Sequence, residues 1–192
     1  FWDKNAGRYD RFMRKDRAAY EEMYAHIRPV VKAKTVLDLA TGTGLIAKHI
    51  VNAAAHIEAT DASAEMIAEA KRDNHSAKLH FSVQDMFRLP YADESFDVVI
   101  VSNALHIVPQ PEKALQEIKR VLKDDGVLIA PTFTHAGNSF SGMVRAFFMR
   151  MAGFPLHSKW TSKEYLRFLR QNGWAVRKSA VLKASFPLTY AE

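Results

Sequence analysis

The stretch Thr35–Ala47, with the sequence TVLDLATGTGLIA, constrains the fold of this chain more than any other. Its apolar first part predicts a buried strand, and the pattern that begins at Leu45 predicts a helix. Gly42 and Gly44 stand between them, where a backbone without Cβ atoms can take positive φ and let a ligand approach the main chain. With Ala47 they match the dinucleotide fingerprint G-x-G-x-x-G/A, which is not specific by itself.

A carboxylate, Asp38, lies near the end of this predicted strand. A dinucleotide would place its pyrophosphate at the N-terminus of the following helix, where free N–H groups and the helix dipole attract anions. Asp38 would repel that pyrophosphate, but it would suit a cationic ligand such as S-adenosylmethionine, which carries an ammonium, a sulfonium and no phosphate. The alternative is that Asp38 only opens the turn.

A second carboxylate, Asp61, ends the next predicted strand, seventeen residues after Gly44. A ribose-binding acid is expected about twenty residues after a glycine fingerprint. Asp61 is therefore predicted to accept hydrogen bonds from both hydroxyls of a ribose, which S-adenosylmethionine and NAD share. The alternative is that it caps the helix Ser63–Asp73.

Polar and sulfur-containing side chains follow the next two predicted strands. Asp85 is predicted to accept a hydrogen bond from an adenine amine while Met86 packs on the ring; the alternative for Asp85 is an acid in a loop. Ser102 and Asn103 end a strongly apolar strand, and ligands of open α/β sheets bind outside the carboxyl ends of such strands.

His106 follows the same strand and has two interpretations. It could act as the general base on a substrate hydroxyl or amine, or it could only line the cofactor site. The other seven histidines show no spacing typical of metal ligands, and the chain has no cysteine. We therefore expect no metal site, no disulfide and no cysteine nucleophile.

The pattern from Thr35 onward alternates strands and helices through five β-α units, which predicts a parallel sheet with right-handed crossovers. The predicted helices are 45–53, 63–73 and 111–122, and the strands after the first are 56–61, 78–83, 97–101 and 127–133. Thr161 and Glu164 form a predicted capping box for a helix to about Asn172 that Gly173 ends. Two further strands, within 174–183 and 184–191, are close enough in sequence to pair antiparallel.

Two segments flank this predicted core. Phe1–Arg28 is either a lid, in which Tyr9 and Phe12 touch cofactor or substrate, or a helix on the outside of the sheet that ends at Pro29. The apolar helical pattern after His135 is a substrate lid, an interfacial membrane helix, or a helix packed on its own domain. We expect a single domain over 1–192, with a lid segment 1–28, a cofactor-binding core 35–133 and a substrate-side insertion 135–172.

Length and composition agree with one compact domain, since the chain has 192 residues of which 48% are hydrophobic. The net charge is +6, and after Asp125 nine Lys/Arg stand against two acids. That part could attract an anionic substrate, a nucleic acid or a membrane, or could only be a solubilising surface. Without a secretory signal or an apolar run of bilayer length, a cytoplasmic enzyme is expected. The first residue is Phe1, which suggests that a short leader is missing.

Four segments resemble the successive motifs of the class I S-adenosylmethionine-dependent methyltransferases. They are VLDLATGTG, ATDASAEMI, LPYADESFDVVIVSNALH and ALQEIKRVLKDDG, and the resemblance runs from about Arg8 to about Phe133. It is nearest to the type 11 group, which includes ubiquinone and menaquinone C-methyltransferases. The resemblance implies an α/β, Rossmann-like doubly wound sheet of seven mostly parallel strands, with one antiparallel strand near the C-terminus and helices on both faces.

The resemblance also implies the roles of individual residues. Asp38, Ala40, Gly42 and Gly44 would line the methionine part of the cofactor, Asp61 and Ala62 the ribose, and Met66, Asp85 and Met86 the adenine, while Ser102, Asn103 and His106 would border the methyl group. Thr41 and Tyr9 complete the predicted cofactor-binding set. Ala40-Thr41 stands where many members have Gly-Cys or Gly-Gly, and the further signatures of the quinone enzymes after strand five are absent.

The predicted function is methyl transfer from S-adenosylmethionine to a small-molecule acceptor, apolar or anionic. The sulfonium is already a good methyl donor, so the protein needs to hold the nucleophile in line and exclude water. Asn103 is followed by Ala-Leu rather than Pro-Pro-aromatic, which speaks against amino-group DNA methylation. The alternatives are an RNA methyltransferase that uses the basic C-terminal third, an NAD-dependent oxidoreductase, and a non-catalytic S-adenosylmethionine-binding protein.

Overall fold

The structure is a computed structural model, and it describes residues 14–135 and 157–192. Its helices are the 3₁₀-helix η1 (Arg14–Asp16), α2 (Arg17–Val30), α3 (Leu45–Ile50), α4 (Ala64–Arg72), α5 (Pro111–Val121) and α7 (Ser162–Gln171). Its strands are β1 (Thr35–Leu39), β2 (His56–Asp61), β3 (Leu79–Val83), β4 (Phe96–Val101), β5 (Leu122–Ile129), β6 (Thr132–Phe133), β7 (Ser179–Leu182) and β8 (Leu188–Ala191).

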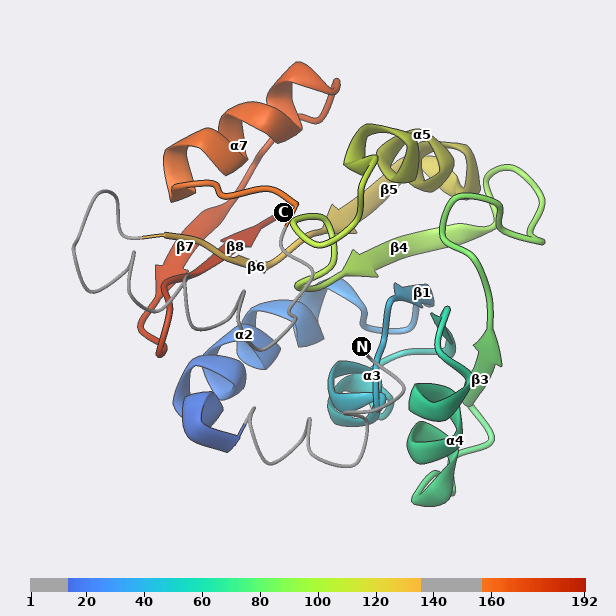
Figure 1. The fold of residues 1–192 in the computed structure, drawn as a ribbon. Helices are drawn as coiled ribbons and strands as arrows, with labels where there is room; N and C mark the ends of the chain where they lie inside the picture. The colour runs from blue at the N-terminus through green and yellow to red at the C-terminus, as the bar shows by residue number, and fades with distance from the viewer. Residues whose placement is uncertain (1–13, 136–156) are drawn as a thin grey trace.

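The strands form two sheets (Figure 1). Five strands pair in parallel in the order β3-β2-β1-β4-β5, and three short strands pair antiparallel in the order β6-β8-β7. The predicted Rossmann-like fold is therefore confirmed, as is the antiparallel pairing of the two C-terminal strands. The expected single sheet of seven strands differs, since the described strands divide five and three.

The division between the two sheets lies at Pro131. One predicted strand, 127–133, is broken there into β5 and β6, because proline has no N–H to donate to a ladder. Ala130, between β5 and β6, donates from its N–H to Ala191 O of β8 at 2.9 Å. The Pro131 carbonyl instead accepts from Asn103 N at 2.9 Å, which ties the break to the end of β4.

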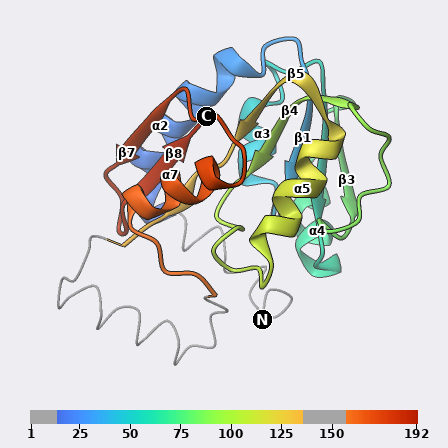
Figure 2. The ribbon, with the colours of Figure 1, turned by 90° about the horizontal axis from the view of Figure 1, so that it is seen from above.

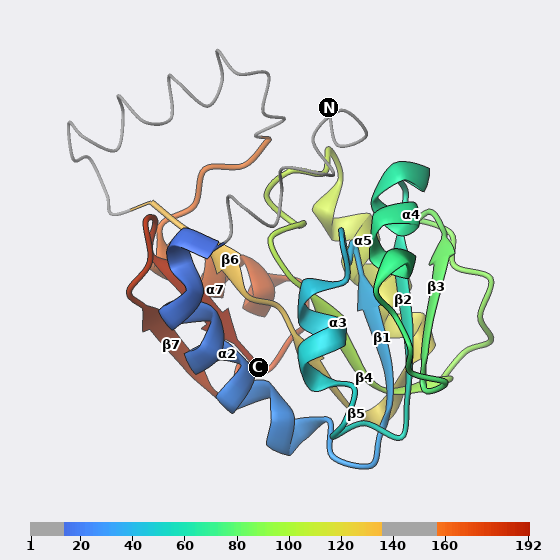
Figure 3. The same ribbon diagram turned by 90° about the horizontal axis from the view of Figure 1, so that it is seen from below.

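Helices cover both faces of the parallel sheet. Figures 2 and 3 show α5 and α7 on one side of the strands and α2, α3 and α4 on the other. Along β1, Val36 is buried on the side of α2, α3 and α4, whereas Leu37 and Leu39 are buried on the side of α5 and α7. Each side therefore has its own apolar core. This alternation is the two-residue period of a strand covered on both faces.

The proline in α2 does not end that helix at Arg28 as predicted. Pro29 lies inside the last turn and the helix continues to Val30. The proline removes one donor, but Val31 N still donates to Ile27 O at 3.1 Å, so the helix closes after the proline. The helix 45–53 was likewise predicted too long, because the described α3 ends at Ile50.

Asp124, Asp125 and Gly126, which precede the predicted strand 127–133, lie inside a bulge of β5. Leu122 pairs with Phe96 and Val127 pairs with Val98, so four residues of β5 face the single residue Asp97. A Cβ on Gly126 would lie 2.7 Å from the Leu122 side chain, which shows how tightly the chain folds back there. The bulge lies at the amino ends of β4 and β5, away from the carboxyl ends of the strands.

Candidate functional site

The candidate site is a cavity of about 220 Å³ at the carboxyl ends of the parallel strands. It lies where the strand order reverses between β1 and β4, which is where ligands bind in open α/β sheets. Its lining is Ala40, Gly42, Thr60, Asp61, Ala62, Met66, Gln84, Asp85, Met86, Phe87, Ser102, Asn103, Ala104, Ile107 and Val108. Nine of the predicted site residues are thus brought together. A larger groove of about 320 Å³ beside β5 and Trp174 contains none of them.

The loop between β1 and α3 has the conformation that its glycines allow. Ala40, Gly42 and Gly44 all have positive φ, at 51°, 59° and 78°. A Cβ on Gly44 would lie 2.6 Å from Cζ of Phe81, so this position needs glycine for packing as well as for its backbone. Ala40 takes a left-handed conformation in which an L-residue is disfavoured.

Asp61 connects the glycine loop to the end of β2. Its Oδ2 accepts from Gly42 N at 2.9 Å and its Oδ1 accepts from Ser63 N at 2.9 Å. The cap of α4 is Ser63, whose Oγ accepts from Met66 N at 3.1 Å, so the alternative role of Asp61 as helix cap is taken by Ser63. A carboxylate oxygen can accept more than one hydrogen bond, so these two contacts leave Asp61 able to bind ligand hydroxyls.

Asp38 is the most buried acid of the site, with 1% of its surface exposed. The pKa of Asp38 is raised to about 7, mainly by burial; the Thr41 hydroxyl, which donates to Oδ2 at 2.6 Å, acts against this shift, and the nearby charge of Asp61 adds to it. No Lys or Arg among the described residues forms an ion pair with Asp38. The carboxyl group thus lacks the cation that would stabilise its charged form.

Asp38 lines a second, small cavity of about 20 Å³, which shares Ala40 and Ser102 with the main site. Its lining includes Tyr20, Thr41 and Ser102. The hydroxyl of Ser102 is buried and has no hydrogen-bond partner among the described residues. A buried polar atom of this kind needs an explanation, and a ligand group or a water in this cavity would satisfy it.

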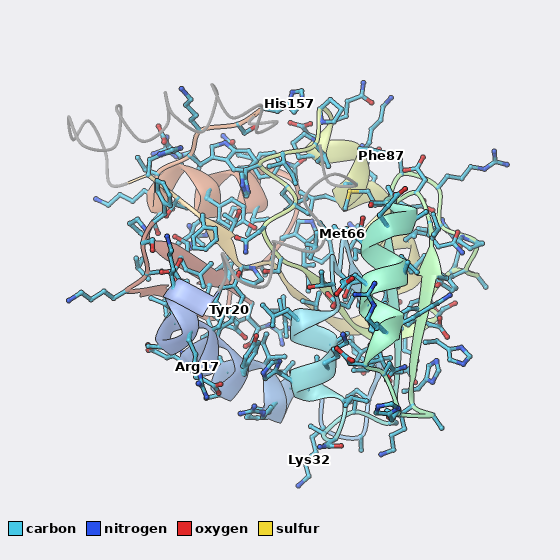
Figure 4. The ribbon with its side chains drawn as sticks, turned by 60° about the horizontal axis from the view of Figure 1, so that its bottom comes forward. Arg17, Tyr20, Lys32, Met66, Phe87 and His157 are labelled. Carbon is cyan, nitrogen blue, oxygen red and sulfur yellow. The ribbon has the colours of Figure 1, made fainter. Side chains whose placement is uncertain are left out.

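Asn103 joins three elements at the wall of the cavity. Its φ is 52°, its Nδ2 donates to Oη of Tyr20 in α2 at 2.9 Å, and its Oδ1 accepts from Phe133 N in β6 at 3.0 Å. One donor and one acceptor site of its side-chain amide are therefore used within the protein. Tyr20, on α2 in Figure 4, was not predicted as a site residue, because its helical spacing indicated only a packed face.

The opposite wall comes from α4 and from the loop after β3. Met66 lies on α4 and Phe87 in that loop, and both are labelled in Figure 4. Asp85 Oδ1 accepts from Phe87 N at 2.9 Å, which is a turn formed by the side chain of Asp85 itself. Met86 is 9% exposed and belongs to the core on the α5 side. The loop is thus shaped by Asp85 and anchored by Met86.

His106 lies close to this site but does not line its main cavity as described. Its ring is 6% exposed, and Nδ1 is 2.7 Å from Oγ1 of Thr132. Its pKa is lowered to about 4, mainly by burial and in smaller part by the neighbouring His135, so the ring is neutral at pH 7. The carbonyl of His106 accepts from the backbone N–H groups of His157 and Ser158, at 3.0 and 2.9 Å.

The remaining predicted residues and segments have different outcomes. Gly44 caps α3 and supports the loop without lining the cavity. Tyr9 and Phe12, with the rest of 1–13, and residues 136–156 of the predicted insertion lie outside the described residues. The apolar lining at Ile107 and Val108 was missed, because a short loop has no periodicity that assigns its side chains to a site.

The fold and the site together define a Rossmann-like domain that binds a ligand at its topological switch point. The lining contains two carboxylates, Asp61 and Asp85, and no Lys or Arg among its described residues. Asp38 adds a third carboxyl group behind the loop. Such a site favours a cationic or neutral ligand over a pyrophosphate.

Comparisons agree with this description. Residues 37–130 match the family model Methyltransf_11, a methyltransferase domain. The demethylmenaquinone methyltransferase of Renibacterium salmoninarum is 38% identical over 105 residues, which cover 55% of this chain and 44% of that protein. The malonyl-[acyl-carrier protein] O-methyltransferase of Pectobacterium atrosepticum is 32% identical over 142 residues, 74% of this chain and 54% of that protein. The chain spans about half the length of these curated relatives.

Among solved structures, a chain of the complex between the Haloferax volcanii Trm112 methyltransferase activator and a methyltransferase has a TM-score of 0.81 at 21% identity. The match covers 99% of this chain and 96% of that one, and it bears on the fold alone. The family match over 37–130 covers almost all residues of the four motifs found in the sequence. The core of this chain, residues 37–130, belongs to the type 11 group of the class I S-adenosylmethionine-dependent methyltransferases. In the described residues, no helix combines the length and the apolar character needed to cross a bilayer.

Proposed function

We propose that this protein binds S-adenosylmethionine in the cavity at the switch point and transfers its methyl group to a small-molecule acceptor. The observation that carries the proposal is the charge of the site. Asp61 and Asp85 line the cavity, Asp38 is buried behind its glycine loop, and the described lining has no Lys or Arg. A phosphate-free ligand with a cationic end fits these residues, whereas the pyrophosphate of NAD does not.

The residues suit the parts of this cofactor as follows. Asp38 and the hydroxyl of Ser102, both buried, would receive the charged amino-acid end, and Asp61 would accept from the ribose hydroxyls. Met66 and Met86 would enclose the adenine ring. The cofactor supplies an activated methyl group when bound. The protein then needs to orient the acceptor and keep water out, for which apolar residues such as Ile107 and Val108 are suited.

For the methyl acceptor we propose only a chemical class. The two curated relatives are named for a demethylated menaquinone and for a malonyl group on acyl-carrier protein. A small molecule is therefore the proposed acceptor class, and the basic excess after Asp125 favours an anionic one. The chain is proposed to form one domain, with the segments 1–28 and 135–172 on the acceptor side. A cytoplasmic location stays a prediction.

The role of Asp61 provides the test of the cofactor site. Asp61→Ala should weaken binding of S-adenosylhomocysteine at least about tenfold, because it removes charged hydrogen bonds of about 1.5–3 kcal/mol each. Isothermal titration calorimetry measures the change, with Asp125→Ala, an exposed acid in the β5 bulge, as the control. Equal affinity of wild type and Asp61→Ala would remove Asp61 from the site.

A general-base role for His106 stays a prediction. With a pKa of about 4 the ring is neutral at pH 7 and can accept a proton, although only as a weak base. If it has this role, His106→Ala should lower turnover more than cofactor affinity, with any acceptor that the wild-type protein methylates. His157→Ala is the control, since that side chain is exposed. If turnover by His106→Ala equals that of the wild type, the base is another group or none is needed.

A further inference from the structure

Arg120, on the last turn of α5, forms several hydrogen bonds with the loop after β3. Its Nη1 donates to Tyr91 O at 2.7 Å and to Asp93 Oδ1 at 2.8 Å, and its Nη2 donates to Leu89 O at 3.1 Å. Glu117, one turn earlier on α5, holds the guanidinium from the other side, with Oε1 at 2.7 Å from Nη2 and Oε2 at 3.1 Å from Nε. All three nitrogens of the guanidinium are therefore engaged.

Glu117 completes the connection to the loop. Its Oε1 also accepts from Leu89 N at 2.8 Å, so both backbone groups of Leu89 are bound by the Arg120–Glu117 pair. Arg120 is 32% exposed and Glu117 17%, whereas Asp93 is 76% exposed. The contacts to the loop backbone are thus better shielded from water than the ion pair to Asp93. They should therefore contribute more than that ion pair to holding the loop in place.

The bound loop is continuous with the wall of the candidate cofactor cavity. Asp85, Met86 and Phe87 line that cavity, and Leu89 is only two residues further on and 5% exposed. Met86 and Leu89 also pack in the same apolar core as α5. A displacement of Leu89 would therefore move the side chains of Met86 and Phe87 relative to the ligand.

We propose that Arg120 is a positioning residue, which acts with Glu117 to hold the segment 85–93 so that Asp85, Met86 and Phe87 form the adenine side of the cofactor site. This inference rests on the proposed function, because it assigns that wall to the adenosyl part of the cofactor. A lysine could not replace the arginine, since a single ammonium cannot reach two backbone carbonyls and two carboxylates in a fixed fork.

The test compares Arg120→Ala with Lys123→Ala. Lys123 forms an ion pair of 2.8 Å with Asp97, similar in length to the Arg120–Asp93 pair, but in the β5 bulge away from the cavity. Calorimetry at a temperature where both variants are folded should show that Arg120→Ala weakens S-adenosylhomocysteine about tenfold and 5′-methylthioadenosine by the same factor. Lys123→Ala should bind both like the wild type. Unchanged affinity in Arg120→Ala would overturn the inference.

A second measurement does not depend on the ligand. Amide hydrogen exchange at Leu89 should become faster in Arg120→Ala, with the change confined to the segment 85–93. If Arg120→Ala does not fold, Arg120→Lys is measured in its place, and wild-type affinity and exchange in that variant would contradict the inference. If the wild-type protein fails to bind S-adenosylhomocysteine, the proposed function fails, and the exchange at Leu89 alone then decides whether Arg120 holds the loop.

Discussion

Asp38 is the site residue whose ionisation should most affect the stability of the ligand-free protein. Its pKa is about 7 in the folded state against 3.8 for an ordinary aspartate, so the folded state holds a proton that the unfolded state has lost. Its contribution to stability is therefore present below about pH 4 and falls as the pH rises to 7. Integrated over that range, the loss is on the order of 4 kcal/mol.

Asp38→Asn should remove this loss, because an amide does not ionise and can still accept from Thr41. We expect the variant to unfold at higher urea concentration than the wild type at pH 7.5, and the difference to shrink at pH 5. Urea denaturation at both pH values measures it. A difference that is the same at both pH values would show that Asp38 does not titrate in this range.

The residues of the site were predictable where a sequence pattern reports a backbone position. Asp61 and Ser102 are at the ends of strands that the apolar pattern locates, so their convergence follows from a parallel sheet. Tyr20 was missed because its place depends on how α2 lies against β4, which spacing within one helix does not specify. The hydrogen bonding of Asn103 to β6 was missed for the same reason, since it depends on the break at Pro131.

At the scale of elements, α7 begins with a complete capping box. Thr161 Oγ1 accepts from Glu164 N at 3.3 Å, and Glu164 Oε2 accepts from Thr161 N at 2.8 Å. The helix packs through Tyr165, whose buried hydroxyl donates to Ala130 O at 2.6 Å at the end of β5. The start of α7 therefore fixes a contact on the seam between the two sheets.

Thr161→Ala should lower the free energy of unfolding by about 1 kcal/mol, because the N–H of Glu164 loses its acceptor and the Glu164 carboxylate loses the hydroxyl that donates to it. Ser162→Ala, one residue later, is the control and should change it little, since its side chain makes no described hydrogen bond. Urea unfolding followed by circular dichroism measures both. Equal effects of the two substitutions would mean that the box does not stabilise α7.

The elements show where the sequence was informative and where it was not. The capping box and the end at Gly173 were predicted correctly because they depend on neighbouring residues. The division into two sheets was not, although Pro131 was visible in the sequence. A proline shows that one donor is missing, but which strand pairs beyond it depends on tertiary contacts such as that between Ala130 and Ala191.

At the scale of the whole molecule, one arrangement accounts for the site. Parallel strands place Asp38, Asp61 and Ser102 at one edge, helices on both faces bury the strands, and the reversal of strand order opens the cavity between β1 and β4. The family match covers this core at 37–130. We therefore assign cofactor binding to this core, and we propose that the segments around it bind the acceptor.

The most direct test of the proposed function is thermal unfolding of the protein with S-adenosylhomocysteine and, separately, with NAD. At a ligand concentration of about one hundred times the dissociation constant, binding should add about 2.7 kcal/mol and raise the Tm by several degrees. We predict a rise with S-adenosylhomocysteine and none with NAD, because Asp61 and Asp85 line the cavity and no described Lys or Arg there balances a pyrophosphate. A rise with NAD alone would contradict the assignment of Asp38 and, with it, the proposed function.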